Sequence, residues 1–316
     1  MKRATGSRRV REVTAGRSLR SLREQADARE LADVRHVLAL WMSGRSTSQQ
    51  VAAAASELGG IGTLWRQLVP RADAPLLFAR ADAELELARR CGAQVLVPSS
   101  DDFPNRLKDA RLVPFLVAQG SLATALTPPH SVTVVVGENQ PAESYAQAAR
   151  MVERLTAEGV SVVLSDDALA DVIAKSVQDC HRIAVVVPCG IAHVAPDGAT
   201  ATIRERGGTV LSTELPSSAG RRTWRLSTYE VMSRLTGGTL ISTSLEINHL
   251  KALSAFSPHD HTIFVARRVV AKKPWILDSL PGQRTVIVHQ AVDIVDTLAV
   301  YAADEPASHV PPVLTI

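Results

Sequence analysis

The sequence predicts an α/β fold, a Rossmann-like, doubly wound and mostly parallel sheet with a small helical subdomain before it. Three observations support this prediction. Residues 131–165 have the pattern of a strand, a glycine turn, a helix and a second strand. Apolar runs then alternate with helical patterns, which indicates parallel connections. The composition, 46% hydrophobic with only 4% aromatic residues, is typical of Ala, Val and Leu layers between helices and a parallel sheet.

The unit over residues 131–165 organises the chain. Val132–Val136 is a β-branched run that suits a strand buried on both faces, and Val160–Leu164 supplies the next strand. Gly137 allows the turn between the first strand and the helix. Such a turn presents backbone N–H groups and the positive end of a helix, a natural site for phosphate. The GxGxxG motif is absent and Glu138 follows the glycine. A plain strand-to-helix connection is therefore as well supported as an anion-binding site.

Later elements follow the same alternation. The remaining strands are predicted at Ile183–Val187, Thr209–Ser212, Thr239–Ser242, Thr262–Ala266 and Thr285–Val288, with helices that include Ala199–Arg206, Thr228–Leu235 and Val292–Tyr301. The Rossmann-like domain is therefore assigned to residues 131–303, followed by a loose tail over 304–316.

The part before this domain divides into three segments. Residues 1–30 are rich in arginine and predict a disordered basic arm, which either adds attraction to nucleic acid or is only solvated. Residues 31–75 predict a helical, SAM-like subdomain. Residues 76–130 form a lead-in and linker, with a helix at Ala79–Arg90 and short strands at Val95–Val97 and Phe115–Ala118.

Composition narrows the class of protein. The net charge of +3 and the pI near 8.9 permit a nucleic-acid partner without requiring one. Cys91, Cys180 and Cys189 show no CxxC spacing, so neither a zinc site nor a disulfide framework is indicated. The sequence has no apolar run of about 18 residues and no apolar signal-peptide core. A cytoplasmic protein without a membrane partner is expected.

Several segments in the same order resemble the DNA-processing protein A family, also called DprA or Smf. They are DFPNRL, VPFLVAQG, VTVVVG, AEGVSVVLS, RIAVVVPCGI, ERGGTVLSTELPSSAG, RLTGGTLIS, TIFVARR and RTVIVHQAVDIVDTL, and the match runs from about Val95 to Leu298. No single piece is specific; their order and spacing carry the resemblance.

The chain departs from the family at its ligand motifs. Gly137-Glu138-Asn139 stands where the family has GSR, and Pro188-Cys189-Gly190 keeps one glycine of a G.G turn. The family's SG.A.GID..AH turn is replaced by SDDALADVIAKS from Ser165, and its RNR by Thr228-Tyr229-Glu230. The apolar strands remain, so the resemblance implies that the fold survives and that the ligand pocket has changed.

The resemblance implies a non-enzymatic protein that binds single-stranded DNA, acts in recombination or transformation, protects DNA and loads a RecA-type recombinase. It also implies a homodimer formed through the Rossmann domain, and no cofactor.

Basic side chains are the candidates for DNA binding, because phosphate contacts supply most nonspecific affinity. The first cluster consists of three arginines around an indole on which bases can stack: Arg221, Arg222, Trp224 and Arg225. The second cluster follows a late strand and consists of Arg267, Arg268, Lys272 and Lys273. Lys175 is a further, single candidate. Phosphate-binding turns are assigned to Gly137, Asn139, Ser165 and Gly190. Because parallel strands end at one edge, the clusters are expected to converge there. A solvated basic loop is the competing interpretation.

Other chemistry has less support. His259 and His261 flank an aspartate, but a polar turn explains them better than a metal site, and no metal is predicted. Asp166, Asp167 and Asp171 are explained more simply as helix capping than as an acid-base or magnesium site. Two alternatives stay open. One is a nucleotide-binding or nucleoside phosphoribohydrolase-like protein, although this chain has only a fragment of the PGGxGT turn that those enzymes carry. The other is a degenerate paralogue that serves as a scaffold.

Overall fold

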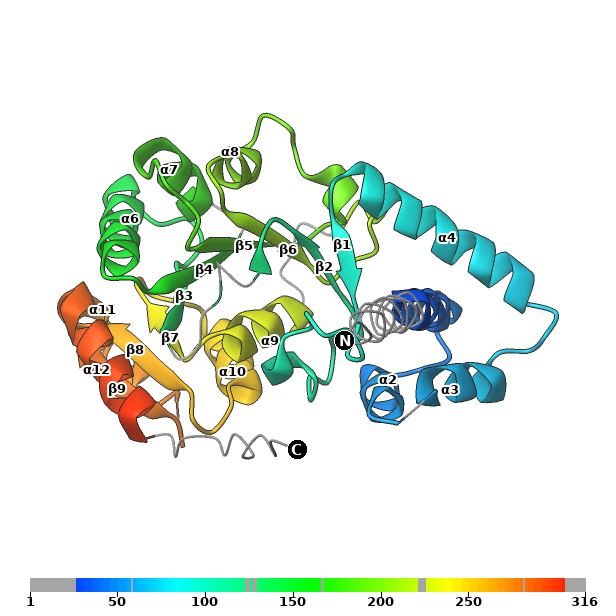
Figure 1. Ribbon diagram of the computed structural model, residues 1–316. Helices are drawn as coiled ribbons and strands as arrows, with labels where there is room; N and C mark the ends of the chain where they lie inside the picture. The colour runs from blue at the N-terminus through cyan, green and yellow to red at the C-terminus, as the bar shows by residue number, and fades with distance from the viewer. Residues whose placement is uncertain are drawn as a thin grey trace, which may run out of the picture.

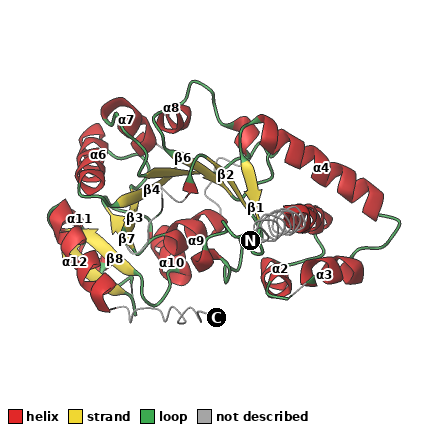
Figure 2. Ribbon diagram, in the orientation of Figure 1, coloured by secondary structure: helices red, strands yellow, loops and turns green. Residues whose placement is uncertain are grey.

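The computed structural model describes residues 27–57, 59–122, 126, 130–165, 168–220, 226–280 and 282–304. Residues 301–304 are described as backbone only. The described residues form one nine-stranded sheet covered by helices on both faces, with a further group of helices at one end (Figure 1 and Figure 2). The predicted α/β, Rossmann-like fold with a helical part before it is confirmed.

The sheet has the strand order β1-β2-β6-β5-β4-β3-β7-β8-β9. From β3 onward all neighbouring strands are parallel. Residues of β3 to β8 are buried throughout because helices cover both faces, which is why their sequences are continuous apolar and β-branched runs, whereas in the edge strand β9 only Val288 is buried. The strands are β1 Gln94–Leu96, β2 Leu116–Gln119, β3 Ser131–Val135, β4 Ser161–Ser165, β5 Ile183–Val187, β6 Thr209–Ser212, β7 Gly238–Ile241, β8 Thr262–Ala266 and β9 Arg284–Val288.

Two helical layers cover the sheet. One hydrophobic cluster joins one face to α6 Ala142–Ala157, α7 Ala168–Ser176, α8 Ala199–Glu205 and α12 Ala291–Asp304. The other joins the opposite face to α9 Leu226–Leu235, α10 Ile247–Phe256, α11 Arg267–Lys272 and the short turns η1 Asn105–Leu107 and η3 Pro274–Ile276. The helices α6 and α9 lie on opposite sides of the sheet in Figure 1. The turn η2 Ile191–His193 follows β5.

The lead-in segment is part of the sheet and not only a linker. β2 pairs with β1 and with β6, and both pairings are antiparallel. Phe103, Leu107 and Leu116 are fully buried and belong to the same cluster as α9. The antiparallel extension was absent from the sequence prediction, because runs of three and four residues carry no information on strand direction.

The N-terminal helices stack on the end of the molecule next to β1. They are a helix over residues 27–43, α2 Ser48–Ala55, α3 Gly60–Leu68 and α4 Ala74–Arg90. Trp65 stacks on Phe78 with ring centroids 4.5 Å apart, and the Arg35 guanidinium lies 4.4 Å from the Phe78 ring. Their buried residues belong to the same cluster as α6 and α7, so this part packs continuously with the Rossmann-like part.

Most predicted elements lie within a few residues of the observed ones, and α4 begins earlier than the predicted Ala79. α11 was not assigned from the sequence. Residues 1–26 of the predicted arm (1–30) and residues 305–316 of the predicted tail (304–316) lie outside the described residues, whereas residues 27–30 already belong to the first described helix. Within the described part of the chain, no helix has the length and apolarity that a bilayer crossing requires.

Candidate nucleic-acid interface

The order of the strands places a topological switch point between β3 and β7. The chain leaves β3 for α6 on one face, whereas it leaves β7 for α10 on the other. In open α/β sheets, ligands bind at the carboxyl ends of strands at such a point. The two loops meet here: the Gly137 amide donates a hydrogen bond to Thr243 Oγ1 at 2.6 Å. The carboxyl edge around this contact is therefore the first place to examine for a binding site.

The glycine turns are built for close packing. A Cβ on Gly137 would lie 2.2 Å from the Ser244 carbonyl oxygen, and one on Gly190 would lie 2.1 Å from that of Leu215. The Gly190 amide donates to the Ser218 carbonyl at 2.7 Å. Both glycine amides therefore already have acceptors inside the protein. These two amides are therefore not free to bind phosphate in this conformation, because the neighbouring loops supply their acceptors.

Replacing Gly190 with alanine should destabilise the protein by about 1–3 kcal/mol or more, because the new methyl group meets backbone oxygen atoms that cannot rotate away. Gly62→Ala is the matched control: a Cβ at this position in α3 meets nothing within 4 Å. Alanine in a helix interior should stabilise by about 0.5–1 kcal/mol. Urea unfolding followed by circular dichroism measures both; equal midpoints for the two variants would contradict the packing role of Gly190.

Arg268 is fixed at the switch point. Its Nε and Nη2 donate to the Ser242 carbonyl at 3.2 and 3.1 Å, and Nη2 donates to Ser242 Oγ at 3.0 Å. Partial burial lowers the pKa of the guanidinium, the charge of Arg150 lowers it further, and Glu143 opposes both. Arg268 thus ties α11 to the carboxyl end of β7 and remains half-buried there. Arg268 is a positioned cation and not a solvated one.

Neighbouring charges around Arg268 have both signs. Arg267 is exposed beside it, with Nη1 3.5 Å from Nδ1 of His289, and Arg150 is exposed on α6. Glu138 and Glu143 are exposed in the β3 to α6 turn and the first turn of α6. The described part of this edge therefore carries a basic group on the β8 side and carboxylates on the β3 side.

Two further lysines of the second predicted cluster lie at the other end of α11. Lys272 and Lys273 are exposed, and Lys273 Nζ lies 5.8 Å from the centroid of the Trp275 ring, which is 40% exposed. A helix rises about 1.5 Å per residue, so these lysines lie roughly one to two turns away from Arg267 along α11. The cluster is therefore a strip along α11, with Arg267 and Arg268 at the strand end.

Lys175 does not join this group. It is exposed in the last turn of α7, and the carbonyls of Ala174 and Val177 accept hydrogen bonds from Arg206 at the end of α8. Because α7 begins after β4 and runs back along the sheet, its last turn lies at the amino ends of the strands. Lys175 therefore lies at the opposite edge of the sheet from Arg267, as an exposed side chain on a solvated helix face.

The remaining turn residues differ in exposure. Ser165 is buried at the end of β4. Asn139 is exposed and has a φ of 54°, the only positive φ of a non-glycine residue in the described chain. Asparagine tolerates this left-handed conformation better than most residues. Of the four predicted phosphate-binding positions, only Asn139 therefore presents an exposed side chain.

The first predicted cluster, Arg221, Arg222, Trp224 and Arg225, lies outside the described residues. Both flanks of the segment are described. A Cβ on Gly220 would lie 2.3 Å from the Pro188 carbonyl oxygen after β5. On the other side, Ser227 Oγ lies 3.1 Å from Thr213 Oγ1 after β6. The described residues on either side of the segment 221–225 therefore lie at the carboxyl edge.

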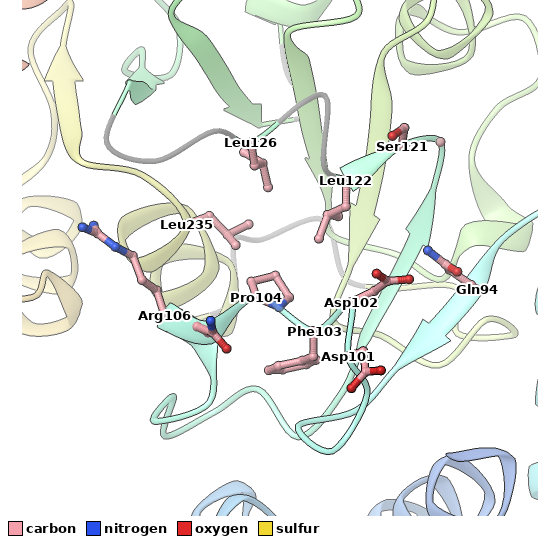
Figure 3. Close-up of a pocket in the computed structure, with 12 residues that line it drawn as sticks. Gln94, Asp101, Asp102, Phe103, Pro104, Arg106, Ser121, Leu122, Leu126 and Leu235 are labelled. Carbon is pink, nitrogen blue, oxygen red and sulfur yellow. The ribbon is translucent and has the colours of Figure 1, made fainter. Parts of the chain in front are cut away.

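A cavity lies away from this edge. It has a volume of about 680 Å³, and Gly120 in its lining lies against the first residues of β6, at the amino edge of the sheet. Figure 3 shows Leu122, Leu126 and Leu235 around Pro104, with Asp101 and Asp102 on one side. Arg106 in its wall is already paired with Asp260 at 3.0 Å. Free carboxylates and an apolar wall do not suit a phosphate backbone.

Glu230 is a residue whose role the sequence did not reveal. Its side chain is completely buried in α9, and its carboxylate accepts hydrogen bonds from the amides of Arg111 and Leu112, each at 2.7 Å. Arg234 Nε lies 3.2 Å from it. The sequence did contain a signal for this role. Glu230 stands among apolar residues of a predicted helix, at a position where the resembling family has arginine. Glu230 fastens the lead-in segment to α9.

No group of three or more His, Cys, Asp or Glu side chains among the described residues has the geometry of a metal site. His261, one of the predicted turn histidines, is fully buried between Thr236 and Thr239.

Comparison with protein-family models finds no match to this chain, and comparison with curated protein sequences finds none either. Comparison with solved structures finds DNA processing protein A (DprA) from Streptococcus pneumoniae, with a TM-score of 0.58 and 14% identity over 82% of this chain and 95% of that chain. A structure that describes the single-stranded DNA binding mode of DNA processing protein A from Helicobacter pylori has a TM-score of 0.48 and 14% identity, covering 66% of this chain and 95% of that one. The chain thus has the fold of DNA processing protein A, in agreement with the resemblance of its motifs.

Proposed function

We propose that this protein binds single-stranded DNA along the carboxyl edge of the parallel strands and acts, without enzymatic activity, in DNA recombination or transformation. The observation that carries the proposal is the position of Arg268 and Arg267 at the switch point, in a sheet with the fold of a DNA-processing protein. Both flanks of the basic segment 221–225 reach the same edge. Phosphate neutralisation by arginine and stacking by Trp224 are the expected contacts.

The carboxylates of Glu138 and Glu143 limit this surface. They repel phosphate near the β3 turn, where the resembling family has an arginine. The single-stranded DNA is therefore expected to pass along the β8 side and across the segment 221–225. Its binding should be strongly sensitive to salt.

Fluorescence anisotropy of a labelled single-stranded oligonucleotide tests the proposal. Arg267→Gln should weaken binding at low salt and reduce the slope of log K against log salt by about 0.7, and the triple variant Arg221→Ala, Arg222→Ala, Arg225→Ala by about 2. Lys175→Gln removes one positive charge, as Arg267→Gln does, but at the amino edge of the strands. This variant should bind the oligonucleotide like the wild type. Absence of binding at low salt, or equal slopes in all variants, would refute the proposal.

A homodimer is part of the proposal, because β9 is an edge strand with one neighbour in the described sheet. Ile287 on β9 and Val292 on α12 are each 44% exposed, and Val300 is 58% exposed. An open strand edge beside exposed apolar side chains suits a second copy of the chain. Sedimentation at increasing protein concentration should show a dimer, which Ile287→Lys should weaken.

We further propose that the protein works in the cytoplasm, protects single-stranded DNA and passes it to a RecA-type recombinase. The support is the motif resemblance together with the shared fold. A strand-exchange assay with purified recombinase, with and without the protein on the DNA, tests this step; no change in the rate of recombinase loading would contradict it.

A further inference from the structure

A groove with an apolar floor and an acidic rim lies at the end of the sheet opposite to β9. It has a volume of about 560 Å³ and runs between the helix over residues 27–43, α4 and β1. Its apolar lining includes Val34, Leu85, Val95 and Leu96. Five carboxylates and one guanidinium also line it: Asp27, Glu30, Asp82, Glu86, Asp102 and Arg89.

Some of these carboxylates are already neutralised. Asp82 pairs with Arg35 at 2.6 Å, and Glu86 with Arg89 at 2.8 Å. Asp27, Glu30 and Asp102 make no ion pair within the described residues. The groove therefore retains a negative charge that the described chain does not balance.

The apolar part of the groove is also incompletely covered. Leu31 in its wall is 59% exposed. β1 is the other edge strand of the sheet and pairs only with β2 among the described strands. An edge strand beside an apolar groove can accept an extended segment through main-chain hydrogen bonds and side-chain contacts.

The segment of the chain that fits this groove is residues 1–26. It carries Lys2 and seven arginines against two glutamates, and its apolar residues include Val10, Val13, Leu19 and Leu22. It joins the described chain at Asp27, which lines the groove itself. We propose that the groove binds the chain's own N-terminal arm, residues 1–26, with basic side chains on the rim carboxylates and apolar side chains on the floor. This inference does not depend on DNA binding.

Limited trypsin digestion of the full chain tests it, because the arm contains eight basic residues where trypsin can cleave. N-terminal fragments are followed by mass spectrometry. Cleavage within the arm should be slow in the wild type at low salt and faster at high salt. The variant Asp27→Asn, Glu30→Gln, Asp102→Asn should accelerate it on the order of tenfold, because an exposed ion pair shifts an equilibrium by roughly 1.4- to 5-fold and three act together.

The control variant is Glu153→Gln, Glu158→Gln, Asp197→Asn, which removes the same charge from exposed positions on α6, at its C-cap and after η2. It should be cleaved like the wild type. Equal arm cleavage in the wild type and the groove variant would overturn the inference. Protection that increases with protein concentration would overturn it as well, since the occupant would then be the arm of a second copy.

Discussion

Glu230→Ala should destabilise the protein by about 3–5 kcal/mol, the range for removing one member of a buried ion pair. Glu230 is completely buried, and the Arg234 side chain is 19% exposed. The substitution leaves the amides of Arg111 and Leu112 without acceptors and Arg234 without its counter-charge. Each unsatisfied buried amide contributes roughly 1–3 kcal/mol to such a loss. Urea unfolding followed by circular dichroism measures the change.

Two comparisons separate this role from a general effect of substitution. Glu230→Gln keeps one acceptor oxygen, so it should fall between the wild type and Glu230→Ala. Glu205→Ala, on the exposed surface of α8, should change stability by less than about 0.5 kcal/mol. Hydrogen exchange at the amides of Arg111 and Leu112 should accelerate in Glu230→Ala. Unchanged exchange there would show that Glu230 does not hold the lead-in segment.

Acidification from about pH 6.5 to pH 4 should remove up to roughly 3 kcal/mol of stability through His261. Burial lowers its pKa to about 4, and the charge of Arg106 adds to the shift, whereas the Thr236 carbonyl and Asp260 oppose it. The unfolded chain binds the proton at higher pH than the folded chain does. Stability is therefore complete above about pH 6.5 and falls with pH until the folded protein is also protonated near pH 4.

The hydrogen bonds around His261 define its neutral form. Nδ1 lies 3.1 Å from the Thr236 carbonyl, which can only accept, so Nδ1 carries the hydrogen, and Nε2 accepts from Thr239 Oγ1 at 2.8 Å. His261→Gln removes the titration and should flatten the stability profile between pH 6.5 and pH 4. The exposed His259→Gln should leave the slope unchanged. Equal slopes for wild type and His261→Gln in urea unfolding would contradict this assignment.

The parallel strands were predictable because their physical signal is local. Ile183–Val187, Thr209–Ser212 and Thr262–Ala266 occur at the predicted bounds, since a strand buried on both faces must be apolar or β-branched along its whole length. The pairing of β2 with β6 was not predictable in this way. It depends on contacts between residues far apart in the chain, such as Val117 with Ser212.

The candidate site was predictable only in part, for the same reason. The chain places Arg267 and Arg268 directly after β8, so their position at the carboxyl edge follows from topology alone. The hydrogen bonds of Gly137 to Thr243 and of Gly190 to Ser218 join separate loops, and no local pattern predicts them. To predict the position of Lys175, the length of α7 must be known, and local motif spacing does not supply it.

The antiparallel seam between β2 and β6 has a consequence for any shortened form of this protein. A chain that starts at residue 131 would lose β1 and β2 and would leave the backbone of β6 unpaired along one side. Bare edges of this kind are templates for intermolecular strand pairing. Such a fragment is expected to aggregate, even though it would contain every parallel strand of the Rossmann-like core.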